Sequence, residues 1–203
     1  NNTARQNVAV GWHAVGGVTV DSDGTALTSR ANTGVGYKAL EDVTSGGYNV
    51  AMGAEAGLNL TTGGSNVFVG ISAGGNTTDV DKAVFIGAGA VTGVATSAAD
   101  GTIAIGYTAG QSLTSGGSNT VIGYQSGKAL TTSGNNIAIG YDSLLSAVDA
   151  CNSNVAIGVQ SMRYVDRGSD GSATVNGNVA VGYNALAGGD FVSADKDLVG
   201  NIA

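Results

Sequence analysis

The sequence predicts an all-β fold, a parallel β-roll or β-solenoid of about ten coils that repeat at a period near 17. Two observations lead to this prediction: a short phrase recurs ten times in nearly constant register, and the composition suits short strands and turns, with 35 glycines, no proline and 11% charged residues. "NNIAIGYDS" (135–143) shows the phrase, and near-copies stand at 102–109, 154–161 and 178–185. Repetition at a fixed short period is typical of stacked units that contact only their neighbours.

The period is read from the glycine that closes each phrase. These glycines are Gly11, Gly36, Gly53, Gly70, Gly87, Gly106, Gly123, Gly140, Gly158 and Gly182. The sequence numbers of successive closing glycines differ by 25, 17, 17, 17, 19, 17, 17, 18 and 24. At a strand spacing of about 4.8 Å, ten coils make a rod roughly 48 Å long. Residues 1–203 are therefore interpreted as one repeat rod, with longer excursions at 16–31, 163–177 and 187–200.

Each phrase has the pattern of a short strand. When the closing glycine is numbered position five, position two is Val or Ile in eight copies, and position four is Val, Ile or Met in all ten. Positions two and four share one side of an extended strand, and position three faces the other side. None of the 23 charged residues lies in the ten five-residue phrases, so both faces should be covered. We expect the β-branched side chains inside the coil, and the Ala and Gly of position three on an outer face.

The other repeated positions have local reasons. The glycine allows positive φ or close approach of the next coil. Position one is Asn in eight copies, and we expect these side chains to stack from coil to coil and satisfy backbone groups at the corner. Position eight is Ala or Ser in all ten copies, which predicts a second tightly packed layer, and a further apolar site recurs near position twelve. Because so thin a coil buries few large side chains, we expect a threefold association along the uncharged outer face.

Composition argues against several functions. The net charge of −7 and the pI of about 4.3 disfavour nucleic-acid binding, because an acidic chain repels phosphate groups. No apolar run suits insertion of this segment into a membrane. The single cysteine, Cys151, has no partner for an internal disulfide and is interpreted as a small buried thiol. We expect no cofactor.

Five copies of the phrase resemble known fibre repeats. "NTVIGYQS" (119–126), "NIAIGYDS" (136–143) and "NVAIGVQS" (154–161) resemble the head repeats of YadA-like trimeric autotransporter adhesins. "NTGVGYKAL" (32–40) and "NVAVGYNAL" (178–186) are similar to the related repeats of phage tail fibres. The resemblance implies a left-handed roll, an intertwined or side-by-side homotrimer, and an extracellular role in attachment. The period is longer than in the usual adhesin head, and no heptad stalk, neck motif or membrane anchor is visible, which favours a virion tail fibre over a bacterial cell-surface adhesin.

Three functions remain open at this point. The favoured one is a fibre segment that attaches to a glycan or protein receptor on a cell surface. The second is a structural filament subunit that assembles end to end, because "NIA" (201–203) reads as the start of another repeat. The third is an ice-binding solenoid, which is disfavoured because the threonine pairs 61–62, 77–78 and 131–132 are too scattered for a flat array.

No residues are predicted to be catalytic. His13 is the only histidine, so a histidine pair for a metal or a nucleophile–histidine arrangement is lacking, and we expect His13 to be a surface or packing residue. Acidic residues occur in pairs, but only in irregular spacers, so the chain is not expected to be an enzyme. The pairs are Asp79 and Asp81, Asp166 and Asp170, and Asp195 and Asp197.

Two further groups of residues are candidates for ligand binding. Asp21 and Asp23 in "DSDGT" make half of an acidic Ca²⁺ loop, although the remaining oxygen ligands are missing. Position six is aromatic in three consecutive coils, at Tyr107, Tyr124 and Tyr141, which should form a ladder. Such a ladder either stacks on sugars, since aromatic rings suit glycans, or packs against another subunit. The three excursions are the first places to look for specificity, because loops on a rigid scaffold often carry recognition.

Overall fold

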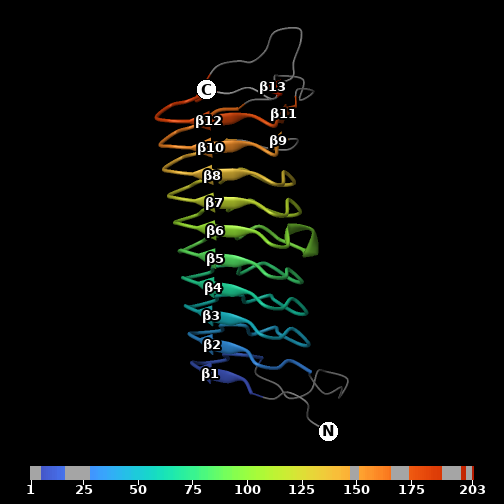
Figure 1. Cartoon of the computed structure of the whole chain (residues 1–203). Coiled ribbons are helices and arrows are strands. Elements are labelled where there is room, and N and C mark those ends of the chain that lie inside the picture. The colour runs from blue at the N-terminus through green and yellow to red at the C-terminus, as the bar shows by residue number, and fades with distance from the viewer. Residues whose placement is uncertain (1–5, 17–27, 147–150, 166–173, 189–197, 200–202) are drawn as a thin grey trace.

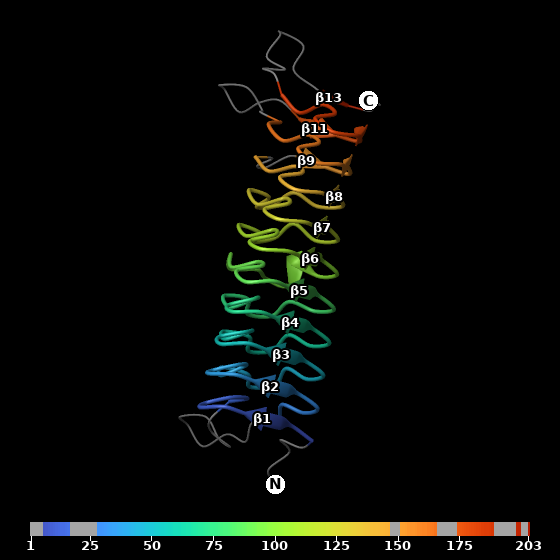
Figure 2. The same cartoon turned by 90° about the vertical axis from the view of Figure 1, so that its left-hand side faces the viewer.

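The chain forms a parallel β-solenoid, seen as a stack of coils from two directions (Figures 1 and 2). The computed structural model describes residues 6–16, 28–146, 151–165, 174–188, 198–199 and 203. Its main sheet has ten strands in the order β1-β2-β3-β4-β5-β6-β7-β8-β10-β12. They are β1 (Val8–Val10), β2 (Thr33–Val35), β3 (Val50–Met52), β4 (Val67–Val69), β5 (Val84–Ile86), β6 (Ile103–Ile105), β7 (Thr120–Ile122), β8 (Ile137–Ile139), β10 (Val155–Ile157) and β12 (Val179–Val181). The all-β solenoid predicted from the sequence is confirmed.

The strands pair in the register that the repeat predicts. Val50 lies opposite Val67, and Met52 lies opposite Val69, so each repeat position meets its own equivalent in the next coil. The same alignment holds across the longer step from β10 to β12, where Val155 lies opposite Val179. Extra residues are therefore accommodated outside the sheet. The left-handed winding implied by the resemblance stays a prediction.

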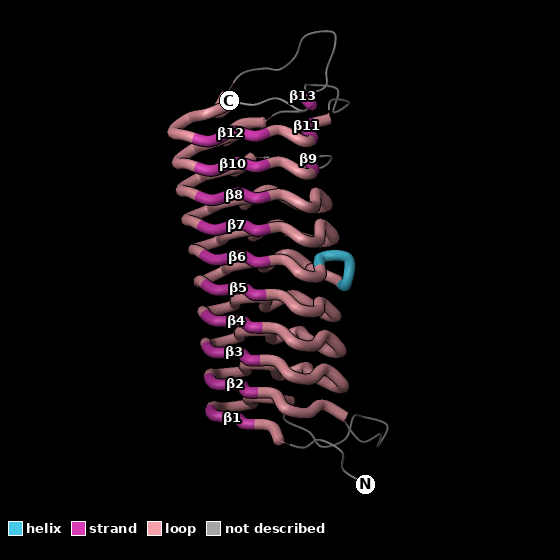
Figure 3. The backbone as a smooth tube through the Cα atoms, viewed as in Figure 1, coloured by secondary structure: helices cyan, strands magenta, loops and turns pink. Residues whose placement is uncertain are grey.

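Two smaller elements depart from the simple coil. A second parallel sheet has the order β13-β11-β9 and consists of β9 (Cys151–Asn152), β11 (Val175–Asn176) and β13 (Leu198–Val199). The only helix among the described residues is the 3₁₀ turn η1 (Ser97–Ala99), drawn in cyan in Figure 3. It lies between β5 and β6, in the coil that runs from Gly87 to Gly106 and is longer than its neighbours, and so takes up the extra length of that coil.

The two faces of the strands are reversed relative to the prediction. Position three points into the coil: Phe68, Phe85 and Ala104 are completely buried. Positions two and four point outward, and Val10 and Val181 at position four are each 57% exposed. The expectation that the β-branched side chains fill the inside, with Ala and Gly outside, is therefore wrong. The coil is too narrow for two large side chains per strand, because its returning segment contributes side chains to the same interior.

The interior is filled by complementary sizes. Where position three carries Phe68, the facing residue is Gly74, whose added Cβ would lie 2.9 Å from the Phe68 ring. Where position three is Ala138, a buried Leu144 takes the equivalent place. Such volume exchange keeps a close-packed core without strain.

Positions eight and twelve line the rest of the core, as the repeat predicts. Ala56 and Ala109 at position eight and Leu60 and Leu130 at position twelve are completely buried. Where position eight is Ser143, its hydroxyl donates a hydrogen bond of 2.8 Å to the carbonyl of Ala156 at position three of the next coil. The predicted second layer is therefore confirmed.

The closing glycines meet both expectations made from the sequence. Gly53 has a φ of 137°, and a Cβ there would lie 2.6 Å from the carbonyl oxygen of Gly70 in the next coil. The other closing glycines have φ between 129° and 141°. The repeat therefore requires glycine here for conformation and for contact between coils.

The asparagines of position one form the predicted ladder inside the corner. The backbone N–H and the side-chain amide of Asn49 both donate to Oδ1 of Asn32, at 3.0 Å. The Asn49 amide also donates to the carbonyl of Gly63 at 2.9 Å. The pattern recurs at Asn136, Asn154 and Asn178. These completely buried side chains satisfy backbone groups that would otherwise have no partner in the core.

Candidate functional site

An apolar face follows the rod. Position three, the face expected to carry the threefold association, is buried from β2 to β12, so the outer face is defined instead as positions two and four of the strands together with position six at the corner after the closing glycine. Of its thirty positions, three in each of ten coils, all are apolar except Thr33 and Thr120. Seventeen large apolar side chains are exposed among the described residues, and fourteen of them lie on this face. The face is thus a continuous uncharged strip on a chain of net charge −7.

The three tyrosines predicted to form a ladder do stack. The ring centroids of Tyr107 and Tyr124 are 5.2 Å apart, and so are those of Tyr124 and Tyr141, with interplanar angles of 20° and 6°. Each ring is about half exposed, between 44% and 51%. Because the rings stack on one another, their faces are occupied within the ladder, and a sugar or another subunit meets mainly their exposed edges.

A second aromatic group lies at position six of the first two coils. Trp12 stacks on Tyr37 with centroids 5.1 Å apart and an angle of 9°. His13, predicted to be a surface or packing residue, lies against the Trp12 ring and places Nδ1 3.0 Å from a Glu41 carboxylate oxygen. Lys38 also contacts Glu41, and this hydrogen bond raises the pKa of Lys38. The group is a packed surface cluster with no arrangement for nucleophilic catalysis.

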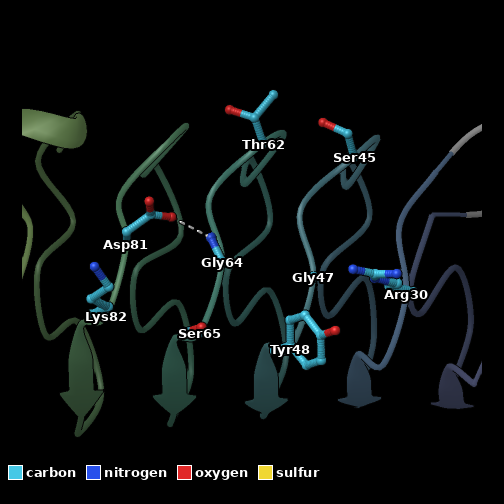
Figure 4. Close-up of a pocket in the computed structure, with 9 residues that line it drawn as sticks. All are labelled: Arg30, Ser45, Gly47, Tyr48, Thr62, Gly64, Ser65, Asp81 and Lys82. Carbon is cyan, nitrogen blue, oxygen red and sulfur yellow. Dashed lines mark hydrogen bonds between the residues drawn. The ribbon is translucent and has the colours of Figure 1, made fainter.

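A polar pocket of about 270 Å³ lies beside the N-terminal ends of the strands, whereas the aromatic corner follows their C-terminal ends (Figure 4). It spans four successive coils. Its lining consists of Arg30, Ser45, Gly47, Tyr48, Thr62, Gly64, Ser65, Asp81 and Lys82. The sequence interpretation missed this pocket, although Arg30 belongs to the excursion 16–31 that was singled out. The available signal was the column of residues two before position one, which reads Arg30, Gly47, Gly64 and Asp81.

Of the acidic pairs, the structure describes Asp79 and Asp81, and both are hydrogen-bonded to backbone N–H groups of other coils. Asp79 Oδ1 accepts hydrogen bonds from the Ser97 N–H at 3.0 Å and the Thr78 hydroxyl at 3.1 Å. Asp81 Oδ1 accepts from the Gly64 N–H at 2.6 Å. Both side chains thus tie one coil to another. The remaining two pairs, at 166 and 170 and at 195 and 197, lie outside the described residues.

The metal candidates Asp21 and Asp23 also lie outside the described residues, together with most of the excursions 16–31, 163–177 and 187–200. In the described part of the chain, no three His, Cys, Asp or Glu side chains come together as a metal site would require. No helix in that part is long and apolar enough to span a bilayer.

Cys151 is buried, as expected of a structural thiol. It is 2% exposed, and its sulfur accepts a hydrogen bond from the Asn154 amide at 3.3 Å. Burial raises the pKa of Cys151 to about 12, because the thiolate would lose its hydration. The thiol is therefore protonated and unreactive at neutral pH.

Some of the threonines align from coil to coil. Thr44, Thr61 and Thr78 form one column, in which the hydroxyls of Thr44 and Thr61 donate to the carbonyl of the next threonine at 3.1 and 3.0 Å. Thr114 and Thr131 repeat the arrangement further along the rod. The column is interrupted after Thr78, whose N–H bonds to the carbonyl of Ala95, so the prediction that the threonines form no regular flat array stands as made. The Thr78 hydroxyl donates to Asp79 in its own coil at 3.1 Å.

Together, these features define, in the described part of the chain, a repeat-built β-solenoid with an apolar face, an aromatic corner and a polar pocket. A scan against protein-family models, a search of curated proteins and a search of solved structures each found no match to the chain.

Proposed function

We propose that this chain is a segment of an extracellular attachment fibre, in which three copies lie side by side along their outer faces. The observation that carries the proposal is the uncharged apolar strip. Nine strand intervals of about 4.8 Å and a length of about 10 Å for each three-residue strand give the strip an area of roughly 430 Å² before the aromatic corner is added. The largest apolar patch of an ordinary monomer is about 300–600 Å² and often functional, so this face favours an interaction role.

A second copy of the same chain is the occupant that fits this face. Its length equals that of the rod, and its period equals the period of the strip, so two copies in register match at every coil. The strands and the aromatic corner form two adjoining apolar surfaces. If the strands of one copy pack on the corner of the next, the two contacting surfaces differ, and such contacts close into a ring when the rotation between neighbouring copies is a whole fraction of a turn. Three copies is the number that the resemblance to trimeric fibres implies.

The role in attachment rests on rigidity and display. Every coil is fixed to its neighbours by backbone pairing and, in most coils, by the asparagine ladder, so surface groups keep constant spacing along the rod. The polar pocket lies outside the outer face and stays available when copies associate through that face. A rigid shaft that presents polar groups at fixed positions suits recognition of a cell-surface receptor. We place this segment on a virion tail fibre in preference to a bacterial surface.

A pair of charge substitutions tests whether three copies associate along their outer faces. Ile105→Glu places a carboxylate on the outer face, while Val94→Glu makes a similar change at an exposed residue outside it. Sedimentation velocity should give a trimer for the unmodified chain and for Val94→Glu, and a smaller species for Ile105→Glu with an unchanged far-ultraviolet circular dichroism spectrum. A monomeric unmodified chain, or equal behaviour of the two variants, would contradict the proposal.

Attachment itself is tested with the assembled protein. The labelled trimer should bind to the surface of susceptible cells in a saturable way, and unlabelled trimer should compete. Binding that neither saturates nor responds to competition would exclude a receptor.

End-to-end assembly is a second candidate, favoured by one observation. Ala203 exchanges hydrogen bonds of 2.9 Å with Val179 and Val181, so its backbone pairs with β12 as the next repeat would. Ice binding lacks comparable support, because the hydroxyls of Thr44, Thr61 and Thr114 are engaged with the next coil and the threonine column is interrupted after Thr78. A thermal-hysteresis measurement on the trimer decides it directly.

A further inference from the structure

The polar pocket owes its shape to two glycines in one column. Parallel stacking aligns Arg30, Gly47, Gly64 and Asp81, each two residues before position one of its coil. The two middle coils have no side chain there, so a trough opens with Arg30 at one end and Asp81 at the other (Figure 4). Because Tyr48, Ser65 and Lys82 follow these positions directly, they line the trough along its length.

The charge of the pocket is opposite to that of the chain. Two of the eight basic residues, Arg30 and Lys82, line it together with one acidic residue, Asp81. Within the part of the chain that the structure describes, Arg30 and Lys82 form no ion pair, whereas Lys38 and Arg163 do. The Arg30 guanidinium lies 5.6 Å from the centre of the exposed Tyr48 ring, which holds its planar fork beside the trough. An unpaired guanidinium in this position suits a carboxylate, which it can bind with two parallel hydrogen bonds.

The remaining groups suit the hydroxyls of a sugar. Ser45, Thr62 and Ser65 contribute hydroxyls that can both donate and accept. Asp81 uses Oδ1 for the Gly64 N–H and has Oδ2 left to accept from a ligand hydroxyl. Its negative charge also disfavours densely anionic polymers, because the three side chains leave only one net positive charge. The volume of about 270 Å³ is slightly below the range of about 300–1,000 Å³ usual for drug-sized ligands, so the pocket suits one or two sugar rings.

We infer that this pocket binds a short saccharide that carries a single carboxylate, with the carboxylate on Arg30 and the sugar hydroxyls on Ser65, Thr62 and Asp81. The inference rests on the proposed function, because it names the class of receptor that the fibre recognises. The Tyr48 ring gives the sugar an apolar surface, as aromatic rings do where one side of a ligand is apolar and the other is wet.

Calorimetric titration of the full chain with matched saccharides tests the inference. The probes are 3′-sialyllactose against lactose, and galacturonate against its methyl ester. The acidic member of at least one pair should bind at least tenfold more tightly than its neutral partner, and binding should weaken as salt is raised. Arg30→Gln should weaken it by about tenfold or more, because it removes a charge-assisted hydrogen bond. Lys128→Gln makes the same charge change outside the pocket and should leave binding within about twofold, the scatter expected of a contact that is not made.

The outcomes separate this inference from the proposed function. It is overturned if no probe binds at millimolar concentration, if neutral and acidic probes bind equally, or if Lys128→Gln weakens binding as much as Arg30→Gln. Sodium acetate that binds as tightly as the acidic saccharides would also overturn it, because the pocket would then recognise any carboxylate. If the trimer binds cells equally well with and without Arg30→Gln, the saccharide assignment fails while attachment stands. If the trimer binds no cells, attachment fails.

Discussion

Truncation of one asparagine inside the corner tests whether the ladder holds the coils together. Asn136 Oδ1 accepts hydrogen bonds from the Asn154 N–H at 3.0 Å and from the Asn154 side-chain amide at 3.1 Å. The Asn136 amide donates to Asn119 Oδ1 at 3.1 Å and to the Cys151 carbonyl at 2.7 Å. Asn136→Ala therefore removes four hydrogen bonds from a completely buried site and leaves the Asn154 N–H without its acceptor.

The expected cost follows from the groups left unpaired. A buried donor or acceptor without a partner costs about 1–3 kcal/mol, so loss of the acceptor for Asn154 and the donor for Cys151 should lower the free energy of unfolding by about 2–6 kcal/mol. Asn59→Ala is the matched control, since it removes a single solvent-exposed hydrogen bond of 3.1 Å to Asn76. That control should cost no more than about 0.5 kcal/mol.

Urea denaturation at one fixed protein concentration measures both variants, because self-association makes stability depend on concentration. Hydrogen exchange at the Asn154 amide adds a local measurement, since stacked repeats open in segments. If Asn136→Ala costs no more than the exposed control Asn59→Ala and Asn154 keeps its protection, the ladder does not hold the coils and the reasoning is refuted.

Two further predictions concern the closing glycines and the buried thiol. Gly53→Ala should lower the free energy of unfolding by about 3 kcal/mol or more, because the new Cβ meets a φ of 137° that L-residues rarely adopt and a carbonyl oxygen 2.6 Å away. At Gly188 an added Cβ meets nothing within 4 Å, so Gly188→Ala should leave stability unchanged. Thermal denaturation compares the two variants, and equal melting temperatures would contradict the prediction. Cys151 should resist iodoacetamide at pH 8 until urea unfolds the chain, and rapid native labelling would disprove its burial. Burial raises the pKa of Cys151 to about 12 in the folded chain, so below pH 9 the thiol is protonated in both the folded and the unfolded chain and its full contribution to stability is present. As pH rises from 9 towards 12, the thiol ionises only in the unfolded chain, so the free energy of unfolding falls by up to about 1.4 kcal/mol per pH unit compared with Cys151→Ala.

The fold could be predicted from the sequence because several repeated positions meet structural requirements that their residue types reveal. The invariant glycine, the asparagine at position one and the small residue at position eight each answer a local need of a stacked coil, and all three appear where expected. The alternation of side chains was also clear, but not which side faces inward. A β-branched residue suits either face of a strand, and only the width of the coil puts Phe68 and Ala104 inside and the valines and isoleucines outside.

The candidate sites were less predictable. The tyrosine ladder follows from identical spacing, so Tyr107, Tyr124 and Tyr141 could be placed from the sequence. The pocket depends on what is missing, since Gly47 and Gly64 create it by lacking side chains in one column. Arg30 joins it across an irregular excursion whose register the regular period does not give. Pattern reasoning finds repeated residues more readily than gaps between them.

Small-angle X-ray scattering of the unmodified chain tests the central claim most directly, because it gives mass and longest dimension from one sample. Side-by-side association predicts three times 19.7 kDa, about 59 kDa, at a length that stays near that of one rod, roughly 45–50 Å for ten coils. A 19.7 kDa particle would contradict association, and a particle whose length grows with its mass would show that the rods join at their ends instead of along their outer faces.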